Sequence, residues 1–138
     1  FTDHLVVQER RGGLVHLRVR PWVGEGAHDI VFDEPTYDGY LSTNREADTA
    51  VLRFGYESLT TPASTYDYDM VTRTRTLLKR EEVVGDFDPS RYRAARLTAT
   101  APDGESIPIS LVVQSRTYSA TGHPSTVVGG WNPEAGSA

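Results

Sequence analysis

LRFGYESLTTPASTYDYDM, residues 52–70, is the stretch that decides the fold. It begins inside a run of β-forming residues (49–57), breaks at a segment of Ser, Thr and Pro, and resumes as a second run (64–70). A third run follows at residues 73–79. Short β-forming runs separated by turn residues are typical of antiparallel strands. The stretch therefore predicts consecutive strands of a meandering sheet.

The residues before this stretch carry the same pattern. Runs at 4–9 and 14–20 flank a Gly-Gly pair, the spacing of a hairpin whose turn needs positive φ. The second run alternates apolar side chains with His16 and basic residues, the period of two expected when one strand face is buried. His16 is therefore expected to point outward. Shorter strands are expected at 28–32 and 40–42.

The residues after it change character. Residues 81–91 are charged and turn-prone, which predicts a linker. Beyond it, runs at 96–101 and 107–113 alternate well around a Pro-Asp-Gly turn, which predicts a second hairpin. Periodicity is lost from residue 115. The expected organisation is sheet over 1–80, linker over 81–91, a hairpin unit over 92–114 and an irregular tail over 115–138.

Short strands without an amphipathic helix predict an all-β fold. Such meanders are repeated radially in a β-propeller, where one blade takes ~40 to 50 residues. Residues 1–80 would then hold slightly less than two blades. The apolar stripe of residues 107–113 would need further elements to pack against.

Composition narrows the function classes. The chain has 138 residues, 38% hydrophobic and 24% charged, which is typical of one globular domain. A net charge of -5 would repel a polyanion, so nucleic acid is not an expected partner. No apolar run approaches the ~20 residues of a membrane span, so no membrane contact is expected. The absence of cysteine is compatible with a reducing cytoplasm, the expected location.

Five strings, in this order along the chain, resemble the oligopeptidase B (protease II) group of the prolyl oligopeptidase family of serine peptidases. They are FTDHLVVQERRGGL from residue 1, FDEPTY from 32, the opening stretch from 52, LLKREEVVGDFDPSRY from 77 and ARLTATAPDGESIPISLV from 95. The resemblance covers roughly residues 1 to 113 and is far more specific than a short motif.

The resemblance implies a seven-bladed β-propeller that caps an α/β-hydrolase domain. The last blade would end near Lys79, and the next hairpin would be the entry to the hydrolase. Members of the family cleave peptides, and oligopeptidase B types cut after Arg or Lys. The chain is then expected to be a fragment, inactive alone, whose partners are the rest of the enzyme and its peptide substrate. A stand-alone β-rich peptide- or protein-binding module is the alternative.

The nucleophile turn of an α/β-hydrolase, Gly-x-Ser-x-Gly, does not occur in the sequence. Its nearest approach, at Ser106, lacks the second glycine and is interpreted as part of a hairpin turn. Ser58, Asp103 and His123 keep the chain order of a triad, but order alone does not place a base beside a nucleophile. The resemblance puts Ser58 inside a blade and the triad beyond residue 138. We therefore assign no catalytic residue.

Other polar residues give weak signals for a site. The histidines are scattered rather than spaced as metal ligands; they are His4, His16, His28 and His123. Asp67 and Asp69 lack the glycine and distal glutamate of a calcium loop, so they are interpreted as outward-facing strand carboxylates. No metal and no cofactor are expected.

Two basic groups are the remaining candidates for a binding surface. They are Arg10, Arg11, Arg18 and Arg20, and Arg73, Arg75, Lys79 and Arg80. Either could contact an acidic peptide or pair with another domain. Solvated strand faces neutralised by Glu9, Glu81 and Glu82 are the favoured interpretation. Arg53, which alternates with Leu52 and Phe54, is expected to face away from the apolar side.

Overall fold

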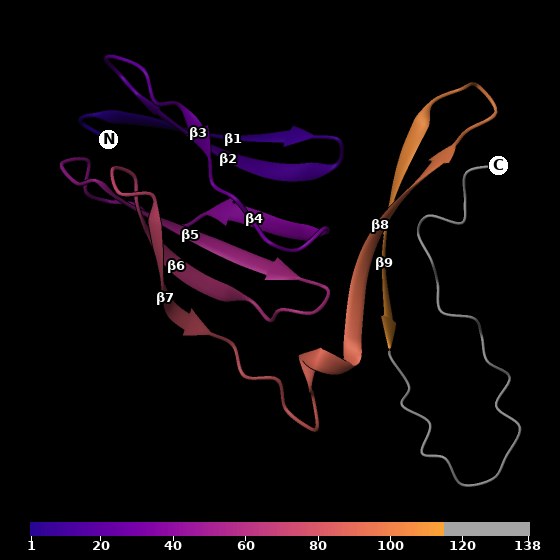
Figure 1. Cartoon of the computed structure of the whole chain (residues 1–138). Coiled ribbons are helices and arrows are strands. Elements are labelled where there is room, and N and C mark those ends of the chain that lie inside the picture. The colour runs from indigo at the N-terminus through magenta and orange to yellow at the C-terminus, as the bar shows by residue number, and fades with distance from the viewer. Residues whose placement is uncertain (115–138) are drawn as a thin grey trace, which may run out of the picture.

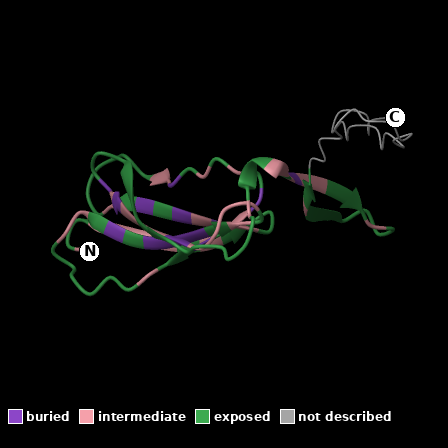
Figure 2. Ribbon diagram, turned by 90° about the horizontal axis from the view of Figure 1, so that it is seen from below, coloured by how far each residue is buried: buried purple, intermediate pink, exposed green. Residues whose placement is uncertain are grey.

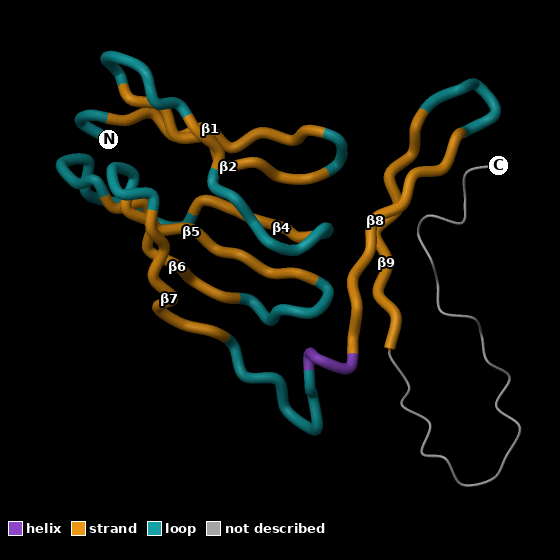
Figure 3. The backbone as a smooth tube through the Cα atoms, viewed as in Figure 1, coloured by secondary structure: helices purple, strands orange, loops and turns teal. Residues whose placement is uncertain are grey.

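The computed structural model describes residues 1–114, which form three antiparallel sheets (Figure 1). The first contains β1 (His4–Arg11), β2 (Leu14–Pro21) and β3 (His28–Asp29). The second is a four-stranded meander of β4 (Tyr37–Leu41), β5 (Val51–Ser58), β6 (Ser64–Asp69) and β7 (Thr74–Arg80). The third is a hairpin of β8 (Tyr92–Thr100) and β9 (Ser106–Gln114). The predicted all-β fold is confirmed, and the only helical element in residues 1–114 is the 3-10 turn η1 (Pro89–Arg91) (Figure 3).

Two short strands differ from the prediction. The strand expected at 28–32 ends at Asp29, because β3 pairs only with Arg18 and Val19 before Ile30 turns into the core. The strand expected at 40–42 begins earlier, at Tyr37, which pairs with Ser58 of β5. Asp38 and Gly39 near its start have little β propensity, so pairing with β5 decides the structure here.

The core lies between the first two sheets, where the buried residues in Figure 2 gather. Apolar side chains of β2 meet alternate residues of β5, and Leu17 and Phe54 have no exposed surface. The predicted alternation is confirmed on both strands. Every second residue of β2 from Val15 to Val19 is buried, and on β5 Arg53 remains exposed between buried neighbours. The buried members are Val15, Leu17, Val19, Ile30, Leu52, Phe54, Tyr56, Tyr68 and Met70.

The turn between β1 and β2 is made by Gly12 and Gly13, with φ of 56° and 81°. Positive φ at both positions was expected from the Gly-Gly pair and is costly for other residues. The turn brings Gly13 against Arg96 and Pro108 of the third sheet.

A segment over residues 81–91 leads from β7 to the hairpin, which stands beside the first two sheets (Figure 1). Asp88 caps η1 by accepting a hydrogen bond from the Ser90 backbone N–H at 2.9 Å. The hairpin turn closes between Ala101 and Glu105. The interpretation of Ser106 as a turn residue was therefore wrong, because it is the first residue of β9 and pairs with Thr100.

Within residues 1–114, no helix has the length and apolar character that crossing a bilayer requires.

Candidate functional site

A single carboxylate, that of Glu34, accepts hydrogen bonds from four hydroxyl groups. Ser58 donates to Oε1 at 2.7 Å and Thr61 to Oε2 at 2.9 Å. Thr60 also donates to Oε1, and the phenol of Tyr56 donates to Oε2. This group of five residues, the Glu34 cluster, lies where β4 begins and β5 ends.

The local sequence explains how the cluster forms. Tyr56 and Ser58 are alternate residues of β5, so their side chains leave the strand on the same face. Thr60 and Thr61 follow in the β5–β6 turn, where the Ser58 hydroxyl accepts their backbone N–H groups at 3.0 and 2.8 Å. The cluster thus joins this turn to the loop before β4. Its sequence signal is the hydroxyl-rich SLTT (58–61), although nothing in that string points to Glu34 as its partner.

In the Glu34 cluster, one ionised carboxylate is hydrogen-bonded by four uncharged hydroxyl groups. Burial raises the pKa of Glu34, but the hydrogen bonds from the four hydroxyls outweigh it, so the pKa is lowered overall. Burial and the hydrogen bond to Glu34 raise the pKa of Tyr56 well above its ordinary value. At neutral pH the carboxylate is therefore ionised and the phenol protonated. The arrangement favours a fixed structural anchor over proton transfer.

The structure does not assemble the Ser58, Asp103 and His123 arrangement. The Ser58 hydroxyl donates its hydrogen bond to the Glu34 carboxylate. Asp103 lies in the β8–β9 turn and accepts a hydrogen bond from the Glu105 backbone N–H at 3.1 Å. His123 lies outside the described residues. Across the described part of the chain, no hydrogen bond joins Ser58 to Asp103.

The other three histidines lie apart from one another and do not form a common site. His28 is bonded to the Gly26 carbonyl through Nδ1 at 3.0 Å and to the Tyr68 hydroxyl through Nε2 at 2.9 Å. His16 lies on the face opposite the core, with Nδ1 4.0 Å from an Asp29 oxygen. His4 belongs to β1. Residues 1–114 contain no group of three acidic or histidine side chains placed to hold a metal ion.

The carboxylates of Asp67 and Asp69 both form bonds within the second sheet and its turns. Asp67 on β6 pairs with Arg53 on β5 through two hydrogen bonds of 2.8 and 2.9 Å. That pairing lowers the pKa of Asp67. Asp69 accepts the backbone N–H groups of Val71 and Thr72 in the β6–β7 turn. The outward-facing interpretation holds for both.

Two members of each basic group contact the segment between β2 and β4. Arg11 pairs with Asp29, and the Arg18 Nε lies 3.8 Å from the other Asp29 oxygen. Arg73 donates to the Gly26 carbonyl at 3.2 Å, and Arg75 binds the Val31 carbonyl and Asp33. Of the acids expected to neutralise these groups, only Glu9 does so, with Arg11, at 3.1 Å. Glu81 and Glu82 were the wrong partners within the described residues, because Arg73 and Arg75 bind the segment between β2 and β4 instead.

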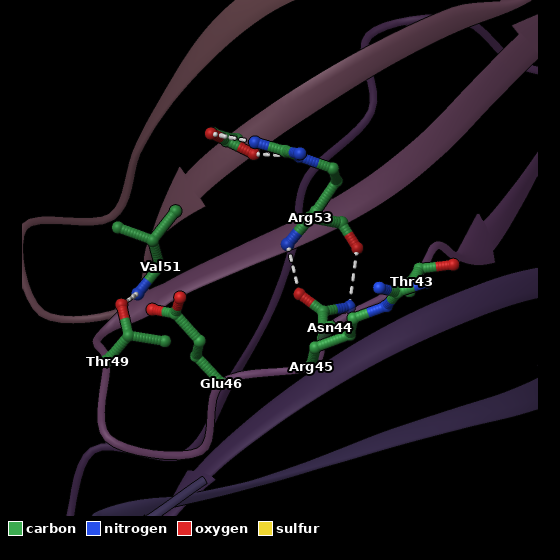
Figure 4. A pocket seen from close by; sticks show the side chains of 8 residues that line it. Thr43, Asn44, Arg45, Glu46, Thr49, Val51 and Arg53 are labelled. Atoms are coloured by element: carbon green, nitrogen blue, oxygen red, sulfur yellow. Dashed lines mark hydrogen bonds and ion pairs between the residues drawn. The ribbon is translucent and has the colours of Figure 1, made fainter.

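Two hollows lie on the first two sheets. The larger, about 470 Å3, is lined mainly by the loop between β4 and β5 (Figure 4). Arg53 and Asp67, which line one side, are paired with each other. The smaller, about 390 Å3, includes His28 and Arg73, whose bonds to Gly26 are given above. Most of the polar groups named here bind other groups of the protein, but Asp29 Oδ1 in the smaller hollow is buried without a hydrogen-bond partner among the described residues. We assign neither hollow a ligand.

A four-stranded antiparallel meander packed face to face on a second sheet is the architecture of neighbouring β-propeller blades. The family described as prolyl oligopeptidase, N-terminal β-propeller domain, matches residues 1–81. This chain belongs to that family.

Individual proteins that are similar to this chain are also named as peptidases. The chain is similar to dipeptidyl aminopeptidase BI of Pseudoxanthomonas mexicana, 42% identical over 114 residues, and to protease 2 of Moraxella lacunata, 32% identical over 117 residues. Each match covers 81% of this chain and 15% or 16% of the relative. Its structure is similar to oligopeptidase B from Trypanosoma brucei with covalently bound antipain, closed form. That match has a TM-score of 0.74 and 31% identity, and covers 84% of this chain and 18% of that one.

Proposed function

We propose that this chain is part of a serine oligopeptidase that cleaves peptides after Arg or Lys. In this proposal β1 to β7 (residues 1–80) contribute blades of the propeller that restricts access to the catalytic domain. Residues 81–91 are the linker, and residues 92–114 are the strands by which the chain enters the hydrolase domain. The observation that carries the proposal is the family match over residues 1–81, together with relatives named as peptidases that continue to align beyond it.

The exposed face of β9 supports the assignment of the hairpin to a larger domain. Ile107, Ile109 and Val113 are 49%, 41% and 39% exposed although they alternate along one strand face. Such a stripe is normally covered in a folded protein. In the proposal, later elements of the hydrolase domain cover it.

The proposal assigns the chemistry to residues outside this chain. Its sequence has no Gly-x-Ser-x-Gly turn, and Ser58 is bound to Glu34, so the chain alone is expected to be inactive. The cysteine-free composition suits a reducing compartment, and the proposal places the enzyme in the cytoplasm. No cofactor, metal or nucleic acid is part of the proposed reaction.

The experiment compares this chain with the longer protein of which it is proposed to be part, in hydrolysis of fluorogenic peptides. An amino-blocked Arg-ending peptide should be cleaved only by the longer protein, and its Ala-ending counterpart much more slowly. Cleavage restricted to peptides with a free amino terminus would instead indicate a dipeptidyl aminopeptidase. Activity of the 138-residue chain alone that survives purification would overturn the assignment.

A stand-alone binding module is the second candidate, favoured by β7. All seven residues of this strand are exposed, and within residues 1–114 only one of its edges is paired, with β6. An extended peptide adds readily to such an edge. Saturable binding of an extended peptide by the purified chain, abolished by Thr76→Pro, would support this function, and no binding would exclude it.

A further inference from the structure

Two aspartates of the chain are followed directly by glycine. They are Asp38, which precedes Gly39 on β4, and Asp103, which precedes Gly104 in the turn between β8 and β9 (Figure 1). A glycine has no side chain to shield its main-chain nitrogen, so this nitrogen can approach the side-chain carboxyl carbon of the aspartate before it. The two pairs have the same chemistry, and the structure places them in different surroundings.

Asp103 and Gly104 lie in a turn that few contacts hold. Pro102 and Gly104 stand at the second and fourth positions of a β-turn, which is closed by a hydrogen bond of 2.9 Å from the Gly104 N–H to the Ala101 carbonyl. Asp103 and Gly104 are exposed, and a Cβ built on Gly104 would have no atom within 4 Å. A change of main-chain angle at Asp103 therefore breaks the turn hydrogen bond and meets open space beside Gly104.

The Asp103 carboxyl points forward along the turn. Its Oδ1 accepts a hydrogen bond from the Glu105 N–H at 3.1 Å. A side chain that reaches the amide two residues on passes beside the amide between them, so the Asp103 Cγ lies on the side of the Gly104 nitrogen. Bringing these two atoms together needs a rotation within the turn. The strands of the hairpin, paired from Thr100 and Ser106 outward, can stay in place.

Asp38 is also close to the nitrogen of its glycine, but β4 holds that geometry fixed. The Asp38 Oδ1 accepts a hydrogen bond from the Gly39 N–H at 3.1 Å. Gly39 is buried, and a Cβ built on it would lie 3.4 Å from the Phe32 Cζ. The two residues are paired with β5, opposite Glu57 and Tyr56. Rotation at Asp38 would break this pairing and disturb the packing, so it needs a local unfolding that the exposed turn does not need.

We propose that Asp103 is a site of spontaneous isomerisation to isoaspartate, and that β4 protects Asp38 from the same reaction. The main-chain nitrogen of Gly104 attacks the Cγ of the protonated Asp103 carboxyl. The new C–N bond closes a succinimide ring, and the hydroxyl of the carboxyl leaves as water with the proton of the nitrogen. One water then adds to the ring carbonyl that came from the main chain, and the bond from that carbon to nitrogen breaks.

The product changes the main chain of the turn. The chain now runs from Cα through Cβ and Cγ of Asp103 to Gly104, so it is longer by one methylene group, and the former main-chain carbonyl is a free carboxylate. The hydrogen bond from the Glu105 N–H to the Asp103 side chain is lost. This modification goes beyond the proposed function, because its reactants are this chain and water and no peptide substrate takes part.

Ageing of the purified 138-residue chain at neutral pH and physiological temperature tests the proposal. After several weeks the chain is digested, and mass spectrometry with electron-transfer fragmentation distinguishes isoaspartate from aspartate of equal mass. Isoaspartate at Asp103 should exceed that at Asp38 at least about tenfold, the factor that ~1.4 kcal/mol of additional opening free energy in β4 produces. Equal amounts at the two sites, or more at Asp38, would overturn the proposal.

The same chain unfolded in urea shows whether the fold causes the difference. Without the strand and the turn, Asp38 and Asp103 should form isoaspartate at similar rates, because both precede glycine. A large difference that persists in urea would contradict protection by β4. Absence of isoaspartate at Asp103 in the folded chain, over a period in which the unfolded chain forms it, would show that the turn prevents ring closure and would refute the proposed site.

Asp103→Glu tests the site by substitution. The longer side chain would have to close a six-membered ring, which forms more slowly, while the charge of the turn is kept. The total isoaspartate of the aged chain, counted with an isoaspartyl methyltransferase, should therefore fall severalfold. Asp86→Glu is the matched control, at an exposed aspartate that precedes Phe87, and should leave the total unchanged. Equal totals in the two variants would place the reaction elsewhere in the chain and contradict the assignment of Asp103.

Discussion

The side-chain amide of Asn44 binds the backbone of Arg53 as a neighbouring strand would. Its Oδ1 accepts the Arg53 N–H at 2.7 Å and its Nδ2 donates to the Arg53 carbonyl at 2.9 Å (Figure 4). Beyond Leu41 the main chain of β4 no longer pairs with β5, apart from one bond from the Ser42 N–H. One amide therefore extends the sheet by about one residue and shapes the larger hollow.

Asn44→Ala should destabilise the chain by about 1 to 2 kcal/mol, because two hydrogen bonds to the backbone are lost at a partly solvated site. Asn44→Asp keeps the acceptor and loses the donor, so its unfolding free energy should fall between those of the wild type and Asn44→Ala. Urea denaturation of the three chains measures this. Equal midpoints for all three would show that water replaces the amide at no cost.

Glu34→Gln should lower the unfolding free energy by about 1 to 2 kcal/mol, because charge-assisted hydrogen bonds are replaced by weaker ones. The lower part of that range is expected, since Glu34 is only half-buried and solvent screens its charge. Glu46→Gln is the matched control, at an exposed position in the β4–β5 loop, and should change stability by less than about 0.5 kcal/mol. Equal losses in the two variants would contradict the anchoring role.

The stability contributed by Glu34 should depend on pH. Its folded-state pKa lies below the ordinary value of 4.5, so its contribution is fully present above 4.5 and is lost as the pH falls through the folded pKa. The difference in urea midpoint between wild type and Glu34→Gln should therefore be largest near pH 7 and shrink below pH 4.5. A difference that stays constant down to about pH 3 would mean that protonating Glu34 costs the fold nothing.

Gly55 should resist substitution because of Tyr40. A Cβ on Gly55 would lie 2.2 Å from the Tyr40 ring, which covers this position on the paired strand. Gly55→Ala should cost about 1 to 3 kcal/mol through overpacking, and less in a Tyr40→Ala background. A double-mutant cycle by thermal denaturation measures the coupling. Additive effects would show that the ring moves aside freely.

The strands that carry their own pattern could be predicted from the sequence. β2 and β5 were predicted because their apolar residues alternate and their partners follow after short turns. β4 was misplaced because its Tyr-Asp-Gly start has no pattern of its own and acquires strand geometry from β5. The same limit applies to Glu34 and Asn44. Each acts by binding groups 9 to 27 residues away in the sequence, and no pattern of neighbouring residues predicts such a contact.

The ion pairs show a similar limit. Arg75 was expected to be neutralised by glutamates close to it in the sequence, yet its partner is Asp33, 42 residues away. Proximity in sequence is a poor guide to pairing when adjacent sheets place distant segments side by side. The bidentate Arg53–Asp67 pair, by contrast, follows directly from the strand register that alternation predicts.

The exposed outer edge of β7 has a consequence for the chain in concentrated solution. Arg75, Lys79 and Arg80 are spaced along this strand and all are exposed, so two copies that approach edge to edge bring like charges together. Charged residues on an edge strand are a recognised barrier to such pairing. Because salt screens that repulsion, turbidity should develop sooner in about 0.5 M than in about 0.05 M sodium chloride. The basic edge of β7 would then slow self-assembly of the chain by electrostatic repulsion.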